Sequence, residues 1–191
     1  MVGNISNYTT HDILRCFLSI RTKQSRQSIV RDLGLGEGTV RTILDFLKCK
    51  GLITSNKKGH SLTYKGLSLL SNISTNLKFK EVNLDEYDHL EKSAILLKTT
   101  TKKKEYELRD IAIKNGAEGA FVFKHDGKRL TMPHMDGYGL DLSHLENSLD
   151  LSKDDLLVVS FARDKRWAEI SNIAIAMEIS PEISRLVKNL I

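Results

Sequence analysis

A set of basic and hydroxyl side chains in the first 60 residues has the chemistry needed to bind a nucleic acid. Guanidinium and hydroxyl groups hydrogen-bond to base edges, and ammonium groups neutralise backbone phosphates. We predict base contacts from Arg41 and Thr42, and contacts to phosphate or the minor groove from Lys57, Lys58 and His60. Protonation of His60 would make binding pH-dependent near its unperturbed pKa of ~6.5. The candidates are Arg26, Thr39, Arg41, Thr42, Lys48, Lys57, Lys58 and His60.

A second group of candidates, in the middle of the chain, has the chemistry to hold a small anion. The run Thr99-Thr100-Thr101-Lys102-Lys103-Lys104 lies between an expected strand and an expected helix. Backbone donors, hydroxyls and ammonium groups would converge there on a helix N-terminus, which favours negative charge. The alternative is a solvated, charged loop. The candidate ligand-binding residues are Thr100, Lys102, Lys103 and Arg109.

Sequence patterns of catalysis, cofactor binding and metal binding are missing. The run 34–38, Gly-Leu-Gly-Glu-Gly, has neither the spacing nor the preceding strand of a dinucleotide-binding loop, and no Walker A sequence is present. His125, His134 and His144 have a spacing that fits no short zinc motif, which favours surface positions. We therefore predict no catalytic residue, no cofactor and no metal.

The remaining nucleophiles also favour structural roles. Ser160 and the pair Ser143-His144 lack the sequence context of a nucleophile elbow. Cys16 lies in an apolar helical segment and Cys49 closes another, so both are expected to behave as small core residues. Their spacing is not that of a Cys-x-x-Cys redox or metal motif.

The nucleic-acid candidates require two short helices joined by a tight turn. A stripe of apolar residues at helical spacing is formed by Val40, Ile43, Leu44 and Leu47. Ser25 is placed to cap a preceding helix that leads into the glycine turn 34–36. A helix capped by Thr9 or Thr10 would complete a three-helix core. Two helices joined in this way are typical of a helix-turn-helix, whose second helix enters the DNA major groove.

The residues that follow predict a basic β-hairpin and a further helix. Residues 52–56 and 61–64 are typical of short strands around Lys57-Lys58-Gly59-His60, and Thr63 is placed to cap a helix through 67–77. The order of these motifs, including Leu62-Thr63-Tyr64-Lys65-Gly66 after a helix that ends in Gly-Leu-Ile, resembles the winged-helix family of transcription regulators. The resemblance covers residues 10–77 and implies that the hairpin is a wing.

Charge is distributed unevenly along the chain. The first 80 residues hold 13 Lys and Arg against 4 Asp and Glu, whereas residues 81–191 hold 16 against 20. Positive charge is therefore concentrated in the part that would meet phosphates. The alternative is a winged helix that docks on protein and carries basic residues only as a solvated surface.

Length and composition indicate a soluble chain of two small domains. The chain has 191 residues, of which 40% are hydrophobic and 28% charged. No apolar run approaches the ~20 residues that a membrane helix needs. The first residues lack the pattern of a signal peptide, so we expect a cytoplasmic protein with no membrane partner. We place the boundary near 80, giving domains 1–80 and 81–191.

The second half alternates between strand and helix patterns. We expect strands at 94–97, 120–123, 129–132 and 156–161, with Asp126-Gly127 as a tight turn, and helices at 105–115, 167–177 and 182–190. The fold class is therefore α+β: a winged helix-turn-helix followed by a small α/β domain of about four strands and three helices. The acidic connection 78–92 would separate the two domains.

One stretch of this half extends the resemblance to the whole chain. Residues 109–120 match an Arg-Asp-x-Ala-x-x-x-Gly-Ala-x-Gly-Ala pattern. This pattern is similar to that of an uncharacterised archaeal family with an N-terminal winged helix and a C-terminal α/β domain. The resemblance implies a regulatory domain and names no effector.

These patterns together favour a DNA-binding transcription regulator. The second domain would sense a small molecule or mediate a homodimer. A homodimer is expected because one short helix reads too few base pairs and paired half-sites lie about 34 Å apart. Two alternatives remain open at the level of sequence. The first is a winged helix that docks on protein without binding DNA, and the second is an enzyme that acts on a small anionic substrate in the C-terminal domain.

Overall fold

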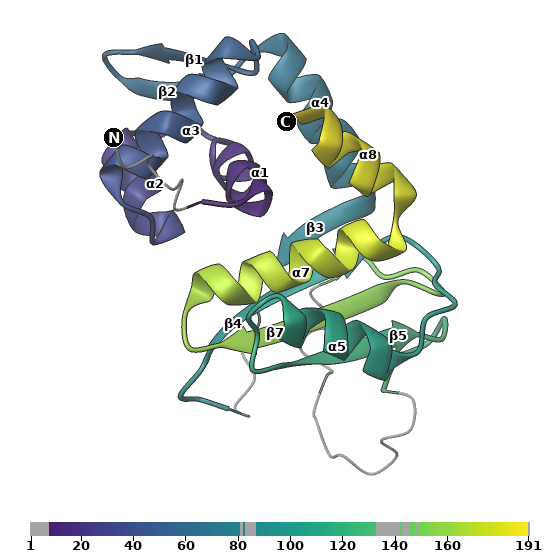
Figure 1. The fold of residues 1–191 in the computed structure, drawn as a ribbon. Helices are drawn as coiled ribbons and strands as arrows, with labels where there is room; N and C mark the ends of the chain where they lie inside the picture. The colour runs from purple at the N-terminus through teal and green to yellow at the C-terminus, as the bar shows by residue number, and fades with distance from the viewer. Residues whose placement is uncertain are drawn as a thin grey trace. The chain divides into compact units, whose positions relative to one another are not determined.

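The computed structural model describes residues 8–80, 82, 87–132, 142, 146–147 and 149–190. The chain forms two compact units. Unit 1 comprises Met1–Ile73 and Arg185–Ile191, and unit 2 comprises Ser74–Ser184. Each unit combines helices with an antiparallel sheet, which confirms the α+β class (Figure 1).

Unit 1 begins with three helices: α1 (Thr10–Ser19), α2 (Arg26–Leu33) and α3 (Glu37–Cys49). The first two begin at the predicted caps, because Thr9 accepts a hydrogen bond from the Asp12 amide and Ser25 accepts one from the Ser28 amide. Gly34 ends α2 with φ 64°, a left-handed conformation that glycine adopts without strain. The predicted apolar stripe of α3 is buried in the core.

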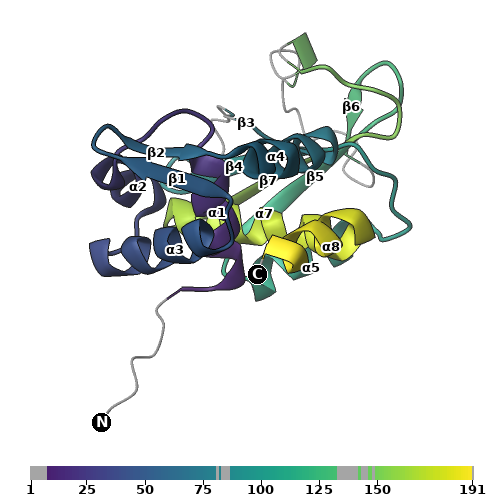
Figure 2. The same cartoon turned by 90° about the horizontal axis from the view of Figure 1, so that it is seen from above.

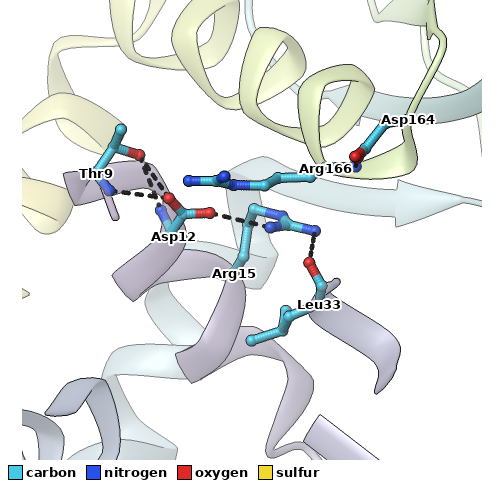
Figure 3. A network of polar contacts seen from close by, with 6 residues as sticks. All are labelled: Thr9, Asp12, Arg15, Leu33, Asp164 and Arg166. Carbon is cyan, nitrogen blue, oxygen red and sulfur yellow. Dashed lines mark hydrogen bonds and ion pairs between the residues drawn. The ribbon is translucent and has the colours of Figure 1, made fainter. Parts of the chain in front are cut away.

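A buried ion pair lies inside α1. Asp12 and Arg15 have side chains that are 0% and 2% exposed, and Arg15 Nη1 lies 3.0 Å from Asp12 Oδ1. Asp12 Oδ2 also accepts hydrogen bonds from the amide and hydroxyl of Thr9, and Arg15 Nη2 donates to the Leu33 carbonyl at 3.2 Å (Figure 3). The pair therefore joins the start of α1 to the end of α2.

A hairpin follows α3 and consists of β1 (Ile53–Asn56) and β2 (Gly59–Leu62). It lies along α3 in both views (Figures 1 and 2). Gln24, in the link before α2, forms an antiparallel bridge to His60, so the hairpin is fixed to the helices from its second strand as well. The next helix, α4 (Tyr64–Asn76), is capped as predicted by Thr63, whose hydroxyl accepts from the Gly66 amide at 3.1 Å.

Gly66 is required where α4 begins, because its Cα faces the Leu52 carbonyl. A Cβ at this position would lie far inside van der Waals contact with that backbone oxygen. We expect Gly66→Ala to destabilise the chain by roughly 1–3 kcal/mol, the usual range for overpacking. Gly38→Ala is the matched control, since nothing lies within 4 Å of its Cβ position in α3. Urea unfolding measures both, and equal free energies of unfolding would contradict the prediction.

Unit 2 is built on one antiparallel sheet. In the described part of the chain its strand order is β3-β4-β7-β5-β6. The strands are β3 (Leu77–Lys80), β4 (Glu91–Leu97), β5 (Gly119–His125), β6 (Leu130–Thr131) and β7 (Leu156–Ala162). Helices α5 (Glu105–Lys114) and α7 (Lys165–Ile179) contact each other and cover the same face of the sheet (Figure 1).

Unit 2 has one strand more than the sequence predicted. The expected strands and helices are present, and all the strand pairs of the described residues are antiparallel, a direction that the sequence indicated only for the predicted hairpin. β3 occupies residues assigned to the acidic connection. It follows α4 with no residue between them and pairs with β4, from Leu77 opposite Leu97 to Lys80 opposite Ala94.

Buried polar groups hold α7 against the sheet. The Ser160 hydroxyl donates to Asn172 Oδ1 at 2.7 Å, and Asn172 Nδ2 donates to the Ser93 carbonyl at 2.8 Å. All three residues are buried. Ser160 therefore has the structural role that the sequence favoured, because its hydroxyl is bonded inside the core.

Two helices belong partly to each unit. α4 passes from unit 1 to unit 2 after Ile73, and α8 (Pro181–Leu190) passes back after Ser184. The last turn of α8 and α4 line a common hollow in unit 1 through Asn189, Ser68 and Leu69. Among the described residues, none of the helices is both long and apolar enough to cross a bilayer.

Candidate functional site

The predicted base-contacting residues lie on the outer surface of α3. Val40, Ile43 and Leu47 face the core with 0% exposure, so the opposite side of the helix faces solvent. Arg41 and Lys48 are exposed on that side, and neither has an ion pair within the described part of the chain. Helical spacing places both on one stripe. This stripe presents two cations that have no ion pair in the described part of the chain, with the exposed Asp45 at helical spacing from both.

The two threonines of α3 differ in availability. Thr39 is half-buried, whereas Thr42 is exposed. The Thr42 hydroxyl donates to the Gly38 carbonyl at 3.1 Å, within the helix. Its lone pairs remain able to accept a hydrogen bond.

Acidic side chains moderate the charge of this surface. Arg26, the first residue of α2, pairs with Glu37 of α3 at 3.0 Å. Asp45 lies one turn from Arg41 on the exposed stripe. Arg26 is therefore partly neutralised at the start of α3, and the free positive charge lies farther along that helix.

The hairpin supplies the rest of the predicted surface. Lys57 and Lys58 are exposed at its tip, where the Asn56 side chain accepts from the Lys58 amide at 2.9 Å. His60 lies near the tip, where it pairs with Ser55, and its Nδ1 is 2.8 Å from the Ser55 hydroxyl. Burial lowers the pKa of His60 from its usual 6.5, as do the cations Arg26 and, to a lesser extent, Lys48. We call Arg41, Thr42, Lys48, Lys57, Lys58 and His60 the helix-hairpin surface.

His60 and His11 make the stability of the chain sensitive to acid. The pKa of each lies below 6.5, chiefly because burial disfavours the imidazolium. The unfolded chain therefore binds protons more readily. The contribution of the two neutral histidines to the free energy of unfolding is fully present above about pH 6.5. It falls as the pH drops from there toward their pKa in the folded chain. The same shift moves any His60-dependent binding below the pH expected from sequence.

We expect a lower urea midpoint at about pH 5.5 than at about pH 7.5, and a smaller difference in His11→Gln and His60→Gln. His89→Gln, at an exposed position in unit 2, is the control and should leave the difference unchanged. A midpoint that rises on acidification would contradict the sign.

Unit 2 contains a cavity of about 770 Å³, within the range of small-molecule sites. Its walls come from α5, β5, the end of β7 and the turn 87–90. Apolar and aromatic side chains predominate, and five of the lining residues carry charged or imidazole groups. The cavity is lined by Tyr87, His89, Leu90, Glu105, Tyr106, Arg109, Ile113, Glu118, Gly119, Ala120, Phe121, Val122, Met132, Phe161 and Arg163.

Stacked rings form one wall of this cavity. Tyr87 lies parallel to Phe161, with ring centroids 4.5 Å apart and an interplanar angle of 12°. Gly119 allows Phe161 to approach β5, because a Cβ there would be 2.6 Å from the ring. Tyr87 has φ 59°, an uncommon conformation for a residue other than glycine. Such backbone conformations cluster at ligand sites.

Of the four predicted anion-binding residues, Arg109 lines the cavity. Lys103 instead pairs with Glu178 at 3.0 Å, and its amide donates to the Thr101 hydroxyl. Thr100 and Lys102 are exposed. The four are therefore not gathered in one pocket. Sequence reasoning missed Tyr87, Phe121 and Phe161, because three separate segments supply them.

Two further predictions were wrong, and those for three other residues fall outside the described part of the chain. His125 is buried, because β5 continues through it, and its Nδ1 has no hydrogen-bond partner in the described part of the chain. Cys49 is exposed at the end of α3, whereas Cys16 is buried and burial raises its pKa to about 12. His134, Ser143 and His144 lie outside the described residues. The described residues contain no cluster of three or more metal-binding side chains.

Comparisons with known proteins match both parts of the chain. Residues 9–68 match the family model PH0730-like, N-terminal domain, and residues 90–179 match a domain of unknown function, DUF4443. The chain is also similar to the solved structure of the hypothetical protein PH0730 from the archaeon Pyrococcus horikoshii OT3. The identity is 27% and the TM-score 0.76, over 94% of this chain and 100% of that one. No curated protein matches. These matches support the resemblance to an uncharacterised archaeal family, and they name no activity.

Proposed function

We propose that this chain is a DNA-binding transcription regulator and that unit 1 is a winged helix-turn-helix. In this assignment α2 and α3 are the helix pair, α3 enters the major groove, and the β1–β2 hairpin is the wing. Unit 2 senses a small molecule, mediates a homodimer, or does both. The helix-hairpin surface is the DNA interface.

One observation carries the proposal most directly: Arg41 and Lys48 are exposed on one stripe of α3 without an ion pair in the described chain. A purely structural helix gains from pairing such cations with acidic neighbours at helical spacing. The two lysines at the hairpin tip add positive charge to the same unit. Cations of this kind release counterions when they meet phosphate, which supports DNA over a neutral protein partner.

Regulation would act through the distance between two DNA-reading helices. A symmetric dimer places its two α3 helices in successive major grooves, about 34 Å apart. A ligand that binds one conformation of unit 2 better than another shifts the equilibrium between them, and with it the mean spacing of the helices. The free energy of this shift is no larger than the ligand's difference in binding free energy for the two conformations. The cavity of unit 2 supports a sensing role, because its size and apolar lining suit a small molecule.

The test is the affinity of the full chain for duplex DNA, measured as the salt concentration is raised. Fluorescence anisotropy with a labelled random-sequence duplex measures the sequence-independent affinity. Selection from a random library identifies a preferred site. We expect affinity to fall steeply with salt, with a smaller slope in the double variant Lys57→Gln/Lys58→Gln, by roughly one unit per lost phosphate contact.

Lys102→Gln/Lys114→Gln is the matched control, because it removes two exposed lysines of unit 2. It should leave the slope unchanged. Absence of DNA retention at low salt would remove the proposal and leave protein docking as the role of unit 1. Equal slopes in the two double variants would exclude the hairpin as a DNA contact.

A further inference from the structure

The cavity of unit 2 combines an aromatic wall with an arginine whose side chain has no partner in the described part of the chain. Tyr87 and Phe161 stack, and Phe121 lies against both at centroid distances of 6.0 and 5.4 Å. Tyr87 remains 41% exposed, so part of its surface is open to a ligand. Flat apolar surfaces of this kind favour ring-shaped ligands, which gain by stacking or by edge-to-face contact.

Arg109 is the arginine of the lining whose side chain is unpaired. It lines the cavity from α5, and in the described part of the chain its side chain has neither an ion pair nor a hydrogen bond. Arg163, the second arginine of the lining, is partly paired, because its Nε lies 3.1 Å from Glu118 Oε1. A guanidinium group binds a carboxylate through two parallel hydrogen bonds, so Arg109 can orient an acid at the rim.

The acidic residues of the lining limit the charge of the ligand. Glu105 and Glu118 both line the cavity, and each carboxylate would repel a second negative charge. A single carboxylate fits Arg109 without large repulsion, whereas a phosphate ester, which carries close to two charges, does not. The mainly apolar lining also excludes a small, strongly hydrated anion as the preferred ligand.

We propose that this cavity binds a small aromatic monocarboxylic acid, with its ring against the exposed part of Tyr87, which the buried Phe161 supports from behind, and its carboxylate on Arg109. The binding site stands on the geometry of unit 2 alone. The further statement that this acid is the effector of DNA binding rests on the proposed function. Arg109 thus selects for charge, and the aromatic wall selects for shape.

The test uses the full chain and 2-naphthoate, with 2-naphthalenemethanol as the uncharged analogue of similar shape. Isothermal titration calorimetry should give saturable binding of the acid, tighter than that of the alcohol. Arg109→Gln should weaken binding of the acid by about tenfold, the order expected for losing a charge-assisted pair of hydrogen bonds, and leave the alcohol unaffected. Lys114→Gln, an exposed cation of α5 that does not line the cavity, is the matched control.

Phe161→Leu tests the aromatic wall and should weaken both probes, while thermal unfolding without ligand reports whether each variant is folded. The proposal is overturned if 2-naphthoate does not bind saturably, if the alcohol binds as tightly as the acid, or if Arg109→Gln and Lys114→Gln behave alike. Inorganic phosphate should not compete, and competition at the same site would also overturn it.

DNA retention is measured separately, with and without 2-naphthoate. If the acid binds to a chain that does not bind DNA, the binding site is supported and the proposed function as a DNA-binding regulator is contradicted. Binding of the acid without a change in DNA affinity would support the site and remove its role as effector.

Discussion

Arg41→Gln is expected to lower the affinity of the chain for its selected DNA site by roughly 10- to 100-fold, or about 1.4–2.8 kcal/mol. Arg41 is exposed on α3 without an ion pair in the described chain, so no internal contact is lost with it. A guanidinium that reads a guanine makes two hydrogen bonds in one plane, which glutamine cannot reproduce. Anisotropy titrations against the selected duplex and a scrambled duplex measure the effect.

The two duplexes separate base reading from charge. Arg41→Gln should lower affinity for the selected duplex much more than for the scrambled one, because a base contact carries sequence information and a phosphate contact does not. Lys57→Gln should lower both equally. Arg129→Gln, an exposed arginine of unit 2, should change neither. Equal losses on both duplexes in Arg41→Gln would show that Arg41 contacts phosphate only.

Asp12→Ala is expected to destabilise the chain by about 3–5 kcal/mol, the range found when one partner of a buried ion pair is removed. Arg15 would keep its charge at a position where its side chain is 2% exposed. The Leu33 carbonyl would remain as one partner, but a neutral acceptor does not compensate a desolvated guanidinium. Equilibrium unfolding of the full chain in urea measures the change.

Two further variants divide this loss into its parts. Thr9→Ala removes the cap of α1 and leaves the ion pair, so it should cost only about 1 kcal/mol. Asp12→Leu/Arg15→Met replaces both charges by apolar groups and should be more stable than Asp12→Ala. If the double variant is the less stable of the two, the attraction within the ion pair exceeds the cost of desolvating its two charges.

Local chemistry allowed the helices of unit 1 to be predicted from sequence. Ser25 and Thr9 accept the amide hydrogen bonds expected of caps, and Gly34 has the left-handed conformation expected of the turn. These interactions join residues a few positions apart, so their pattern is visible in the sequence. The same holds for Thr63 and the start of α4.

Interactions between distant residues could not be predicted. Residues 77–80 were assigned to a helix end and a connection, and only pairing with residues 94–97 makes them a strand. Cys49 was expected in the core because its neighbours are apolar, but the end of α3 leaves it exposed. His125 was expected at the surface, and the length of β5 decides that it is buried. In each case the tertiary arrangement, and not the local pattern, decides pairing or burial.

The candidate sites follow the same division. The helix-hairpin surface comes from two adjacent elements, so its residues could be named in advance. The aromatic wall of the cavity could not, because Tyr87, Phe121 and Phe161 are separated by 34 and 40 positions along the chain. Arg109 was named for a different reason, as part of an anion site with lysines that the fold places elsewhere.

The path of α8 has a practical consequence for expression of fragments. Arg185–Ile191 belongs to unit 1, and Val187 and Leu190 in that segment are fully buried. A truncated gene that stops near codon 80 would encode α3 and the hairpin without these side chains, and would uncover the apolar groups they contact. The smallest self-contained piece that carries α3 is therefore discontinuous in the gene, and C-terminal trimming should impair it even though the cut lies more than a hundred codons downstream of α3.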